Sequence, residues 1–265
     1  MAGLAPPGWN HPCGRRQLTP PASVSRSSAV LEVGLASGSP RRRAILAALG
    51  IPFRLIAVEI DETPRLAERP GALARRLARE KAIAGAHAQP DLAVIGADTV
   101  VSLDNRALGK PSSADEARAT LQALRGRAHQ VITAVATARW TPSHGRDNGA
   151  ASDAGMEVWV EQSISHVWMR PYHADEITAY IATGDPFDKA GSYAIQHAGF
   201  HPVEHFDGCY LNVVGLPLPS LVKILAAARA SAPAMPMSGL LSICAACLAA
   251  SQSEGPRQAG AFCLR

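Results

Sequence analysis

Short apolar runs alternate with helix-patterned segments between residues 31 and 230, and this alternation restricts the chain to a few folds. Residues 92–103 form an almost continuous apolar run, which is typical of a strand buried on both faces. Further expected strands cover residues 31–36, 53–58, 131–140 and 157–168. The expected helices cover residues 40–49, 72–87, 113–126, 173–183 and 217–230. Helices interleaved with strands in this order indicate an α/β fold built on one sheet.

Local residue choices predict where these helices begin and end. Ser39 is a good N-cap with proline at the next position, and Gly50 suits the residue just after the same helix. Ser113 and Glu116 have the spacing of a capping box, in which each side chain bonds the other residue's backbone. Gly184 is expected to end the helix that begins near residue 173.

Composition places the folded unit within residues 31–230, a length that suits one domain. Of all residues 47% are hydrophobic and 18% are charged, which is ordinary for a globular protein. Residues 1–30 and 231–265 are rich in proline and serine and lack periodicity, so we expect a disordered extension and a disordered tail. The apolar patch at 240–250 is shorter than the roughly 20 residues of a membrane span, so no membrane association is expected.

Charge and cysteine content indicate the compartment and the partners. The net charge of +4 is too small by itself to indicate a nucleic-acid-binding protein, and we expect no nucleic acid as a partner. The five cysteines are an odd number, which does not suit a disulfide framework. Cys244 and Cys247 could form half a zinc site or a redox pair, but no second pair accompanies them. A reducing, cytoplasmic location fits best.

The first candidate site is the turn at residues 37–43, where a strand is followed by a helix start with three consecutive arginines. Unpaired backbone N–H groups and the positive end of the helix dipole favour an anion there. Arginine is unfavourable in the first turn of a helix unless an anion compensates for its charge. The turn therefore suggests phosphate binding, with a solvated basic turn as the alternative. It lacks the Gly-Lys-Ser/Thr ending of a P-loop.

The second candidate is Asp98, a carboxylate in the middle of the apolar run. Burying an ionised carboxylate without a partner is costly, so Asp98 should meet a lysine, an arginine or a divalent metal. Thr99 adds a hydroxyl, and Gly96 allows another backbone or a ligand to approach closely. The alternative is an ordinary strand-end aspartate that caps a loop.

Further charged and amide residues are candidates for the same site. Lys81 continues the inward stripe of Leu73 and Leu77, so its ammonium group either reaches solvent or meets an anion. Lys110 lies on a constrained loop, and Glu62 is a possible second carboxylate. Residues 184–196 combine turn residues, charges and an amide, as functional loops often do. In that segment the donor and acceptor of Gln196 could recognise a base edge.

Several sequence blocks occur together in one order and resemble the Maf family of nucleoside triphosphate pyrophosphatases over residues 31–228. The blocks are Leu35-Ala36-Ser37-Gly38-Ser39-Pro40-Arg41-Arg42, Arg79-Glu80-Lys81-Ala82, Gly96-Ala97-Asp98-Thr99-Val100-Val101, Gly109-Lys110-Pro111, Asp188-Lys189-Ala190-Gly191-x-Tyr193-x-Ile195-Gln196 and Val214-Gly215-Leu216-Pro217. The resemblance implies a single domain with a mixed, twisted sheet flanked by helices, and a homodimer. The segment at 141–156 is longer than in short family members and should form a hairpin away from the site.

The resemblance also implies a reaction and roles for individual residues. The family hydrolyses a nucleoside triphosphate to the monophosphate and pyrophosphate with Mg²⁺ or Mn²⁺. By position, Asp98 would be the proton acceptor and would contact the metal with Glu62. The triphosphate substrate would be bound by Ser39, Arg41, Arg42, Lys81, Thr99, Lys110 and Gln196. Among these, Arg41, Thr99 and Gln196 fall where the family sets its base preference. The blocks around the first arginines and Gln196 are similar to the branch that acts on dTTP and UTP, with clearance of modified nucleotides as a further role.

Two other functions remain open at this point. A nucleotide-binding regulator of cell division would bind the triphosphate but leave it intact. A nucleic-acid-binding protein would use the arginines and show a steep salt dependence, but no aromatic platform lies beside the basic turn. The set of Asp98, Lys81 and Lys110 favours hydrolysis.

Overall fold

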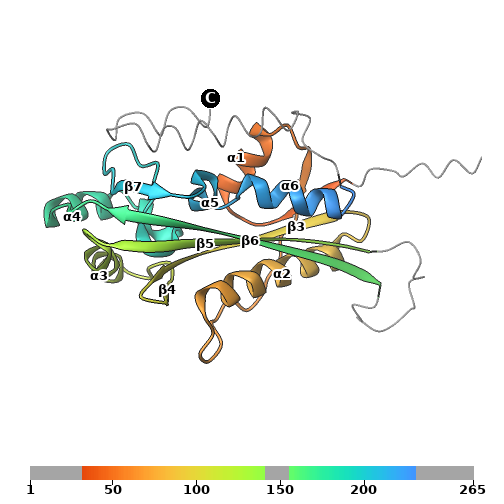
Figure 1. Cartoon of the computed structure of the whole chain (residues 1–265), viewed down its shortest axis with the longest axis horizontal. Coiled ribbons are helices and arrows are strands. Elements are labelled where there is room, and N and C mark those ends of the chain that lie inside the picture. The colour runs from red at the N-terminus through yellow and green to blue at the C-terminus, as the bar shows by residue number, and fades with distance from the viewer. Residues whose placement is uncertain (1–31, 141–154, 231–265) are drawn as a thin grey trace, which may run out of the picture.

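A computed structural model describes residues 32–140 and 155–230, which are built around one seven-stranded mixed sheet (Figure 1). The strand order is β2-β1-β3-β5-β6-β7. The strand β4 pairs with the last residues of β3, whereas β1 pairs with the first ones. Pairing is parallel between β1 and its neighbours β2 and β3, and antiparallel elsewhere. The strands are β1 (Val33–Ala36), β2 (Phe53–Leu55), β3 (Ala93–Leu103), β4 (Arg106–Leu108), β5 (Ala128–Trp140), β6 (Met156–Met169) and β7 (Val203–Asp207). The prediction of a mixed α/β fold is confirmed.

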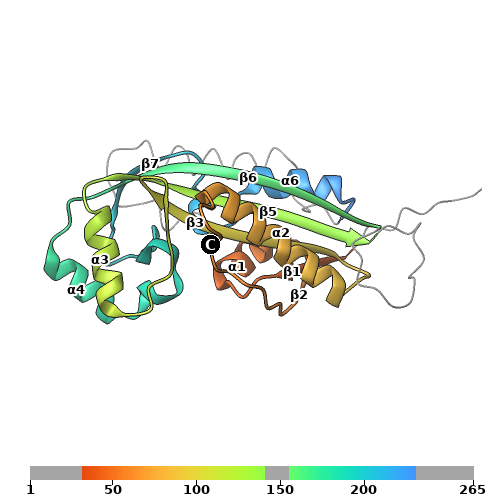
Figure 2. The same cartoon turned by 90° about the horizontal axis from the view of Figure 1, so that it is seen from below.

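Helices cover both faces of the sheet (Figure 2). They are α1 (Pro40–Ala48), α2 (Pro70–Ala88), α3 (Ala114–Leu124), α4 (Ala174–Ala182), α5 (Tyr210–Val214) and α6 (Leu218–Ala227), with the short 3-10 helices η1 (Asp185–Asp188) and η2 (Ala190–Ser192). The helix α2 packs on one face, and its apolar stripe forms one core with alternate residues of β3 and β5. The remaining α-helices contribute to a second core, which includes the other residues of those strands. Successive side chains of β3 point to opposite faces, and both faces are buried in a core. This explains why its sequence is apolar almost without interruption.

The contact between α2 and β3 depends on Gly96. A Cβ atom at this position would lie 2.3 Å from the carbonyl oxygen of Ala78 and 2.5 Å from the backbone nitrogen of Ala82. The helix backbone thus lies directly on the strand, which is the backbone approach that the glycine suggested. This close packing brings the side chain of Lys81, on α2, next to Asp98 on β3.

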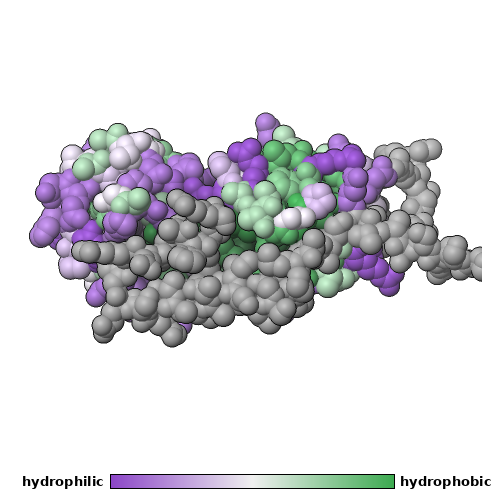
Figure 3. Space-filling view, turned by 90° about the horizontal axis from the view of Figure 1, so that it is seen from above, coloured by the Kyte–Doolittle hydropathy of each residue, from purple (hydrophilic) through white to green (hydrophobic). Residues whose placement is uncertain are grey.

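Seen from above, the surface differs between the two ends of the molecule (Figure 3). Hydrophilic residues dominate the end that carries α3 and α4, and apolar residues gather in the part that carries α1. Within residues 32–140 and 155–230, none of the helices combines the length and the hydropathy that crossing a bilayer requires.

Several boundary predictions were wrong. The second strand was expected to reach residue 58, but β2 ends at Leu55 because its partner β1 ends at Ala36. The strands β4 and β7 and the helix α5 were not predicted, since three to five residues are too few for a periodic pattern. The expected extension at 1–30, the tail at 231–265 with its cysteine pair, and most of the expected hairpin excursion lie outside the described residues.

Helix ends were predicted more closely. Gly50 and Gly184 have φ of 66° and 79°, as residues that follow a helix often do. Ser39 occupies the N-cap of α1, but its side chain makes no capping bond, and the backbone N–H of Ser39 donates to the Oγ of Ser37 instead. At α3 the Ser113 hydroxyl accepts from the Glu116 backbone, whereas the Glu116 carboxylate binds Ser112 rather than closing the expected box.

Candidate active site

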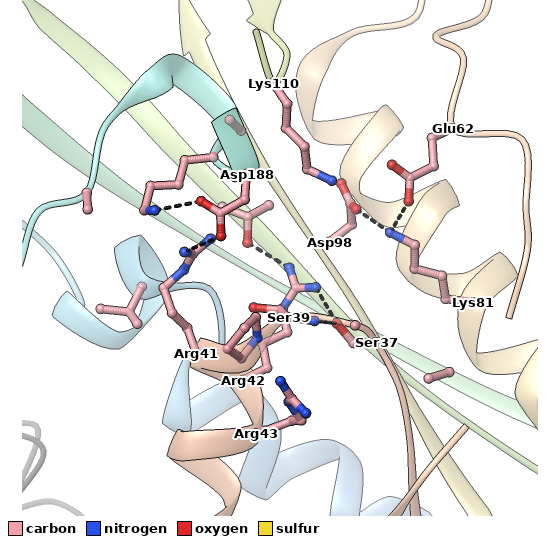
Figure 4. Close-up of a pocket in the computed structure, with 18 of the residues that line it drawn as sticks. Ser37, Ser39, Arg41, Arg42, Arg43, Glu62, Lys81, Asp98, Lys110 and Asp188 are labelled. Carbon is pink, nitrogen blue, oxygen red and sulfur yellow. Dashed lines mark hydrogen bonds and ion pairs between the residues drawn. The ribbon is translucent and has the colours of Figure 1, made fainter. Parts of the chain in front are cut away.

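A cleft of about 630 Å³ lies where the N-terminus of α1, the middle of β3, the segment after β2 and the η1–η2 segment meet (Figure 4). Every residue that the sequence analysis assigned to the site lines this cleft: Ser39, Arg41, Arg42, Glu62, Lys81, Asp98, Thr99, Lys110 and Gln196. These residues come from segments up to 157 positions apart, so the fold gathers them from distant parts of the chain.

Arg42 is almost buried at the base of the cleft, with 8% of its surface exposed. Its Nε donates to the carbonyl oxygen of Gly215 at 2.8 Å, its Nη1 to the Ser37 Oγ at 2.9 Å and its Nη2 to the Thr99 Oγ1 at 3.1 Å. Burial lowers the pKa of this guanidinium from its ordinary value, although the nearby Asp98 charge opposes the shift. All three acceptors are neutral, so the positive charge of Arg42 is held in place without a carboxylate partner among them.

A buried polar network continues behind Arg42. The Thr99 hydroxyl lies 2.9 Å from the Thr133 hydroxyl, which donates to the backbone carbonyl of Asn212 at 2.8 Å. The Asn212 side chain accepts from the Thr133 backbone and donates to the Val131 carbonyl and the Ser165 hydroxyl. The network therefore fixes α5 against β5, and with it the Gly215 carbonyl at the end of α5.

Asp98 faces Lys81 across the contact between β3 and α2. The Lys81 Nζ lies 2.8 Å from the Asp98 Oδ1 and 2.6 Å from the Glu62 Oε1, so one ammonium group joins two carboxylates. The side chains of Asp98 and Lys81 are 13% and 12% exposed, whereas that of Glu62 is 48% exposed. Partial burial alone would raise the pKa of Glu62, but the hydrogen bond and charge of Lys81 outweigh it and lower that pKa. Figure 4 also shows the Lys110 side chain pointing toward Asp98.

The donor set of the cleft suits one kind of metal site. Across the described ranges, no group of three or more histidine, cysteine, aspartate or glutamate side chains is arranged to hold an ion. Asp98 and Glu62 nevertheless share one cation, Lys81, and so their oxygens face a common point. Mg²⁺ is usually held by one or two carboxylates together with substrate phosphates. The two carboxylates fit that mode of binding.

The η1–η2 segment adds residues that the sequence analysis quoted but did not assign to the site. The Lys189 Nζ, with a side chain only 9% exposed, binds the Asp185 Oδ1 at 2.8 Å and the Asp188 Oδ1 at 2.6 Å. The other oxygen of Asp188 lies 3.2 Å from the Arg41 Nη1. Asp188 thus links the tip of α1 to the segment that carries Gln196. The charged residues at 185, 188 and 189 were the available indication of such a linkage.

Two backbone features fix this segment against β3. Gly191 has φ of 72°, and a Cβ atom there would lie 2.9 Å from side-chain atoms of Val101. Its N–H donates to the carbonyl of Gly109, next to Lys110. Near Gln196, the buried Tyr193 hydroxyl forms a 2.8 Å hydrogen bond with the His129 Nε2. The loops that carry Lys110 and Gln196 are therefore held together.

Comparison with known proteins agrees with this arrangement. The family model described as "Maf-like protein" matches residues 32–228. A protein of Thermomicrobium roseum named dTTP/UTP pyrophosphatase is 51% identical over 183 residues, which cover 69% of this chain and 77% of that protein. Proteins of the same name from Chromobacterium violaceum and Alcanivorax borkumensis are 44% and 45% identical, each over 72% of this chain and 92% of the relative. With the family model matching about three quarters of its length, and with the family's blocks gathered in one cleft, this chain belongs to the Maf-like protein family.

Proposed function

We propose that this protein is a nucleoside triphosphate pyrophosphatase, which hydrolyses dTTP and UTP to the nucleoside monophosphate and pyrophosphate. The observation that carries the proposal is the position of Asp98, a largely buried carboxylate in a cleft that Arg42, Lys81 and Lys110 also line. The names of the relatives support the same activity and the same substrates.

In the proposed reaction, Asp98 accepts a proton from the attacking water. The Lys81 ammonium binds the Asp98 Oδ1 and so orients the carboxylate, and we assign the water to Oδ2. The water oxygen forms a bond to the α-phosphorus, and the bond from that phosphorus to the bridging oxygen breaks. The electron pair leaves with pyrophosphate, and the proton remains on Asp98 until solvent removes it.

The cationic side chains bind and orient the triphosphate. A triphosphate carries about four negative charges near neutral pH, and Arg41, Arg42, Lys81 and Lys110 supply four positive charges around it. Because Arg42 is anchored by neutral groups, it can bind a phosphate without first breaking an ion pair. Asp98 and Glu62 would hold a divalent cation, Mg²⁺ or Mn²⁺, which neutralises charge on the phosphates when bound.

The base-recognising end of the cleft is assigned to Arg41, Thr99 and Gln196, with Ser39 on the phosphate side. The amide of Gln196 offers one donor and one acceptor, which suits the edge of a uracil or thymine ring. We expect Gln196→Glu and Arg41→Trp to change the rank order of nucleotides hydrolysed. If the order is unchanged in both variants, base recognition lies elsewhere.

The direct test is pyrophosphate release from a panel of canonical and modified triphosphates with Mg²⁺ or Mn²⁺. We expect dTTP and UTP to be preferred, and Asp98→Asn to lower turnover by roughly 10²- to 10⁴-fold because the base is lost. Asp115→Asn, an exposed change on α3, serves as the matched control and should retain activity. Unimpaired turnover by Asp98→Asn would refute the assigned base, and binding without turnover by the wild type would favour a regulatory role.

A homodimer and a cytoplasmic location stay predictions that accompany this function. Light scattering of the purified full chain should give twice the chain mass, and a monomer at micromolar concentration would contradict the first. Fractionation of cells that express the full chain tests the second.

A further inference from the structure

The segment that carries Glu62 is anchored by apolar packing only before this residue, where Val58 and Ile60 pack against the core. Between the end of β2 and the start of α2 the chain forms no regular structure, and residues 61–67 are all exposed. Within it, Leu66 is fully exposed, and Ala67 has a positive φ of 57°. Because hydrophobic burial cannot fix residues 61–67, polar contacts must do so.

Arg76, on α2, supplies those contacts. Its side chain is 12% exposed and makes a bidentate pair with Glu68, with Nε–Oε1 at 2.8 Å and Nη2–Oε2 at 2.9 Å. The same guanidinium donates to the backbone carbonyls of Thr63 at 2.9 Å and Asp61 at 3.4 Å. These two carbonyls flank Glu62 directly. One arginine therefore binds the chain immediately before and immediately after this glutamate.

One further contact keeps Arg76 in this position, and another closes the turn around Glu62. The Glu80 Oε2, one turn further along α2, accepts from its Nη1 at 3.1 Å. The hydrogen bond from Arg76 lowers the pKa of Glu68 to about 2, so this carboxylate is ionised and the pair is intact at neutral pH. The backbone N–H of Thr63 also donates to the Asp61 Oδ1 at 2.9 Å, which closes a turn around Glu62.

Arg76 and Lys81 hold Glu62 from the same helix but by different groups. Lys81 binds the carboxylate at 2.6 Å, and Arg76 binds the backbone on both sides of it. We infer that Arg76 is a positioning residue for the reaction, which places the Glu62 carboxylate at the phosphate and metal end of the cleft. The inference rests on the proposed function, in which Glu62 helps to bind the divalent cation.

The kinetic test compares Arg76→Gln with Arg75→Gln, the neighbouring and exposed arginine on the same helix. Loss of a supporting contact to a metal-binding carboxylate typically costs roughly 10- to 100-fold in activity or metal affinity. We therefore expect Arg76→Gln to lower kcat and to raise the Mg²⁺ concentration needed for half activity, with a smaller change in the KM for dTTP. Arg75→Gln should match the wild type.

The same substitutions in a Glu62→Gln background separate positioning from a general structural role. If Arg76 acts through the Glu62 carboxylate, Arg76→Gln should change the residual activity by less than about twofold once that carboxylate is absent. An equal loss in both backgrounds would overturn the inference. Should Arg76→Gln fail to fold, Glu68→Gln removes the bidentate partner and should give the same pattern in weaker form.

Hydrogen exchange gives a readout that does not depend on activity. In protein free of metal and nucleotide, amides of residues 59–69 should exchange at least tenfold faster in Arg76→Gln than in Arg75→Gln, with the sheet unchanged. Equal exchange in the two variants would overturn the inference. A wild type that releases no pyrophosphate would instead refute the proposed function, and the exchange result would still decide whether Arg76 orders this segment.

Discussion

Two nearly buried arginines, Arg42 in the lining of the cleft and Arg76 outside that lining on α2, are held by different chemistry. Arg42, on α1, donates its three hydrogen bonds to a backbone carbonyl and two hydroxyl groups. Arg76, on α2, binds the carboxylates of Glu68 and Glu80 as well as two backbone carbonyls. Burial lowers the pKa of Arg42, whereas the hydrogen bond that Arg76 donates to Glu68 raises the pKa of Arg76.

This difference shows how the same residue type serves two purposes. Arg76 directs its hydrogen bonds to two carboxylates and two backbone carbonyls of the protein itself, so it is suited to ordering the chain around it. Burying Arg42 costs desolvation free energy, but its acceptors are neutral and leave its positive charge available. Arg42 is therefore suited to binding a phosphate. Hydrogen-bond partners, rather than burial or position on a helix, distinguish the two roles.

The largest expected effect is that of Arg42→Gln. Removal of a preorganised charge that binds a phosphoryl group typically costs roughly 10³-fold or more, so kcat/KM for dTTP should fall by about this factor. Arg42→Lys should recover little, because one ammonium group cannot reproduce the planar fork that reaches three acceptors. Pyrophosphate release under saturating Mg²⁺ measures both. A loss below tenfold in Arg42→Gln would mean that neutral anchoring does not indicate phosphate binding.

Gly96→Ala should have the next largest effect, because it pushes α2 away from β3. The added methyl group would overlap the α2 backbone, whose nearest atom is 2.3 Å away, so the helix must move and Lys81 must shift from Asp98. We expect a loss of unfolding free energy of about 3 kcal/mol, measured by urea denaturation, together with reduced activity. Gly109→Ala, which has open space around the new atom, is the control for stability. Equal stability of the two variants would contradict the close packing.

The sequence was sufficient for the parts of the site that lie on long regular elements. The inward stripe of Leu73 and Leu77 left two outcomes for the Lys81 ammonium, solvent or an anion, and the structure shows the second, with the side chain 12% exposed and bound to carboxylates. The buried run around Asp98 predicted a cationic partner, and Lys81 is that partner. Both predictions depend on periodicity, which long helices and strands express clearly.

The sequence was not sufficient where the partner is a backbone atom or a short loop. Nothing in the residue type of Gly215 indicates that its carbonyl anchors Arg42 across 173 positions. Arg76 was not identified as a candidate, because the segment that it binds has no periodicity. The strands β4 and β7 were not predicted because they too are short and have no periodic pattern. Tertiary hydrogen bonds to main-chain atoms carry no local signature.

Asn212→Ala should have a moderate effect and tests the neutral anchoring of Arg42. The substitution leaves the buried Thr133 N–H and Val131 carbonyl without their side-chain partner, which costs about 2 kcal/mol of unfolding free energy. Because the Gly215 carbonyl at the end of α5 is then held less firmly, we expect turnover to fall by about tenfold. Denaturation and pyrophosphate release measure the two effects. A stability loss with full activity would show that Arg42 is positioned without this network.

The smallest effect is the pH dependence of the Arg76–Glu68 pair. The pKa of Glu68 is about 2 in the folded protein and 4.5 as its ordinary value, so the pair stabilises the fold above pH 4.5. This stabilisation is lost progressively as the pH falls from 4.5 toward 2. The stability difference between wild type and Glu68→Gln, measured by urea denaturation, should therefore be present at pH 7 and shrink across that range. The corresponding difference for Arg42→Gln should change less across that range, because the three hydrogen-bond acceptors of Arg42 do not titrate and the charges of Asp98 and Glu62 act on it without a hydrogen bond. Parallel pH profiles for the two variants would remove the distinction between the two arginines.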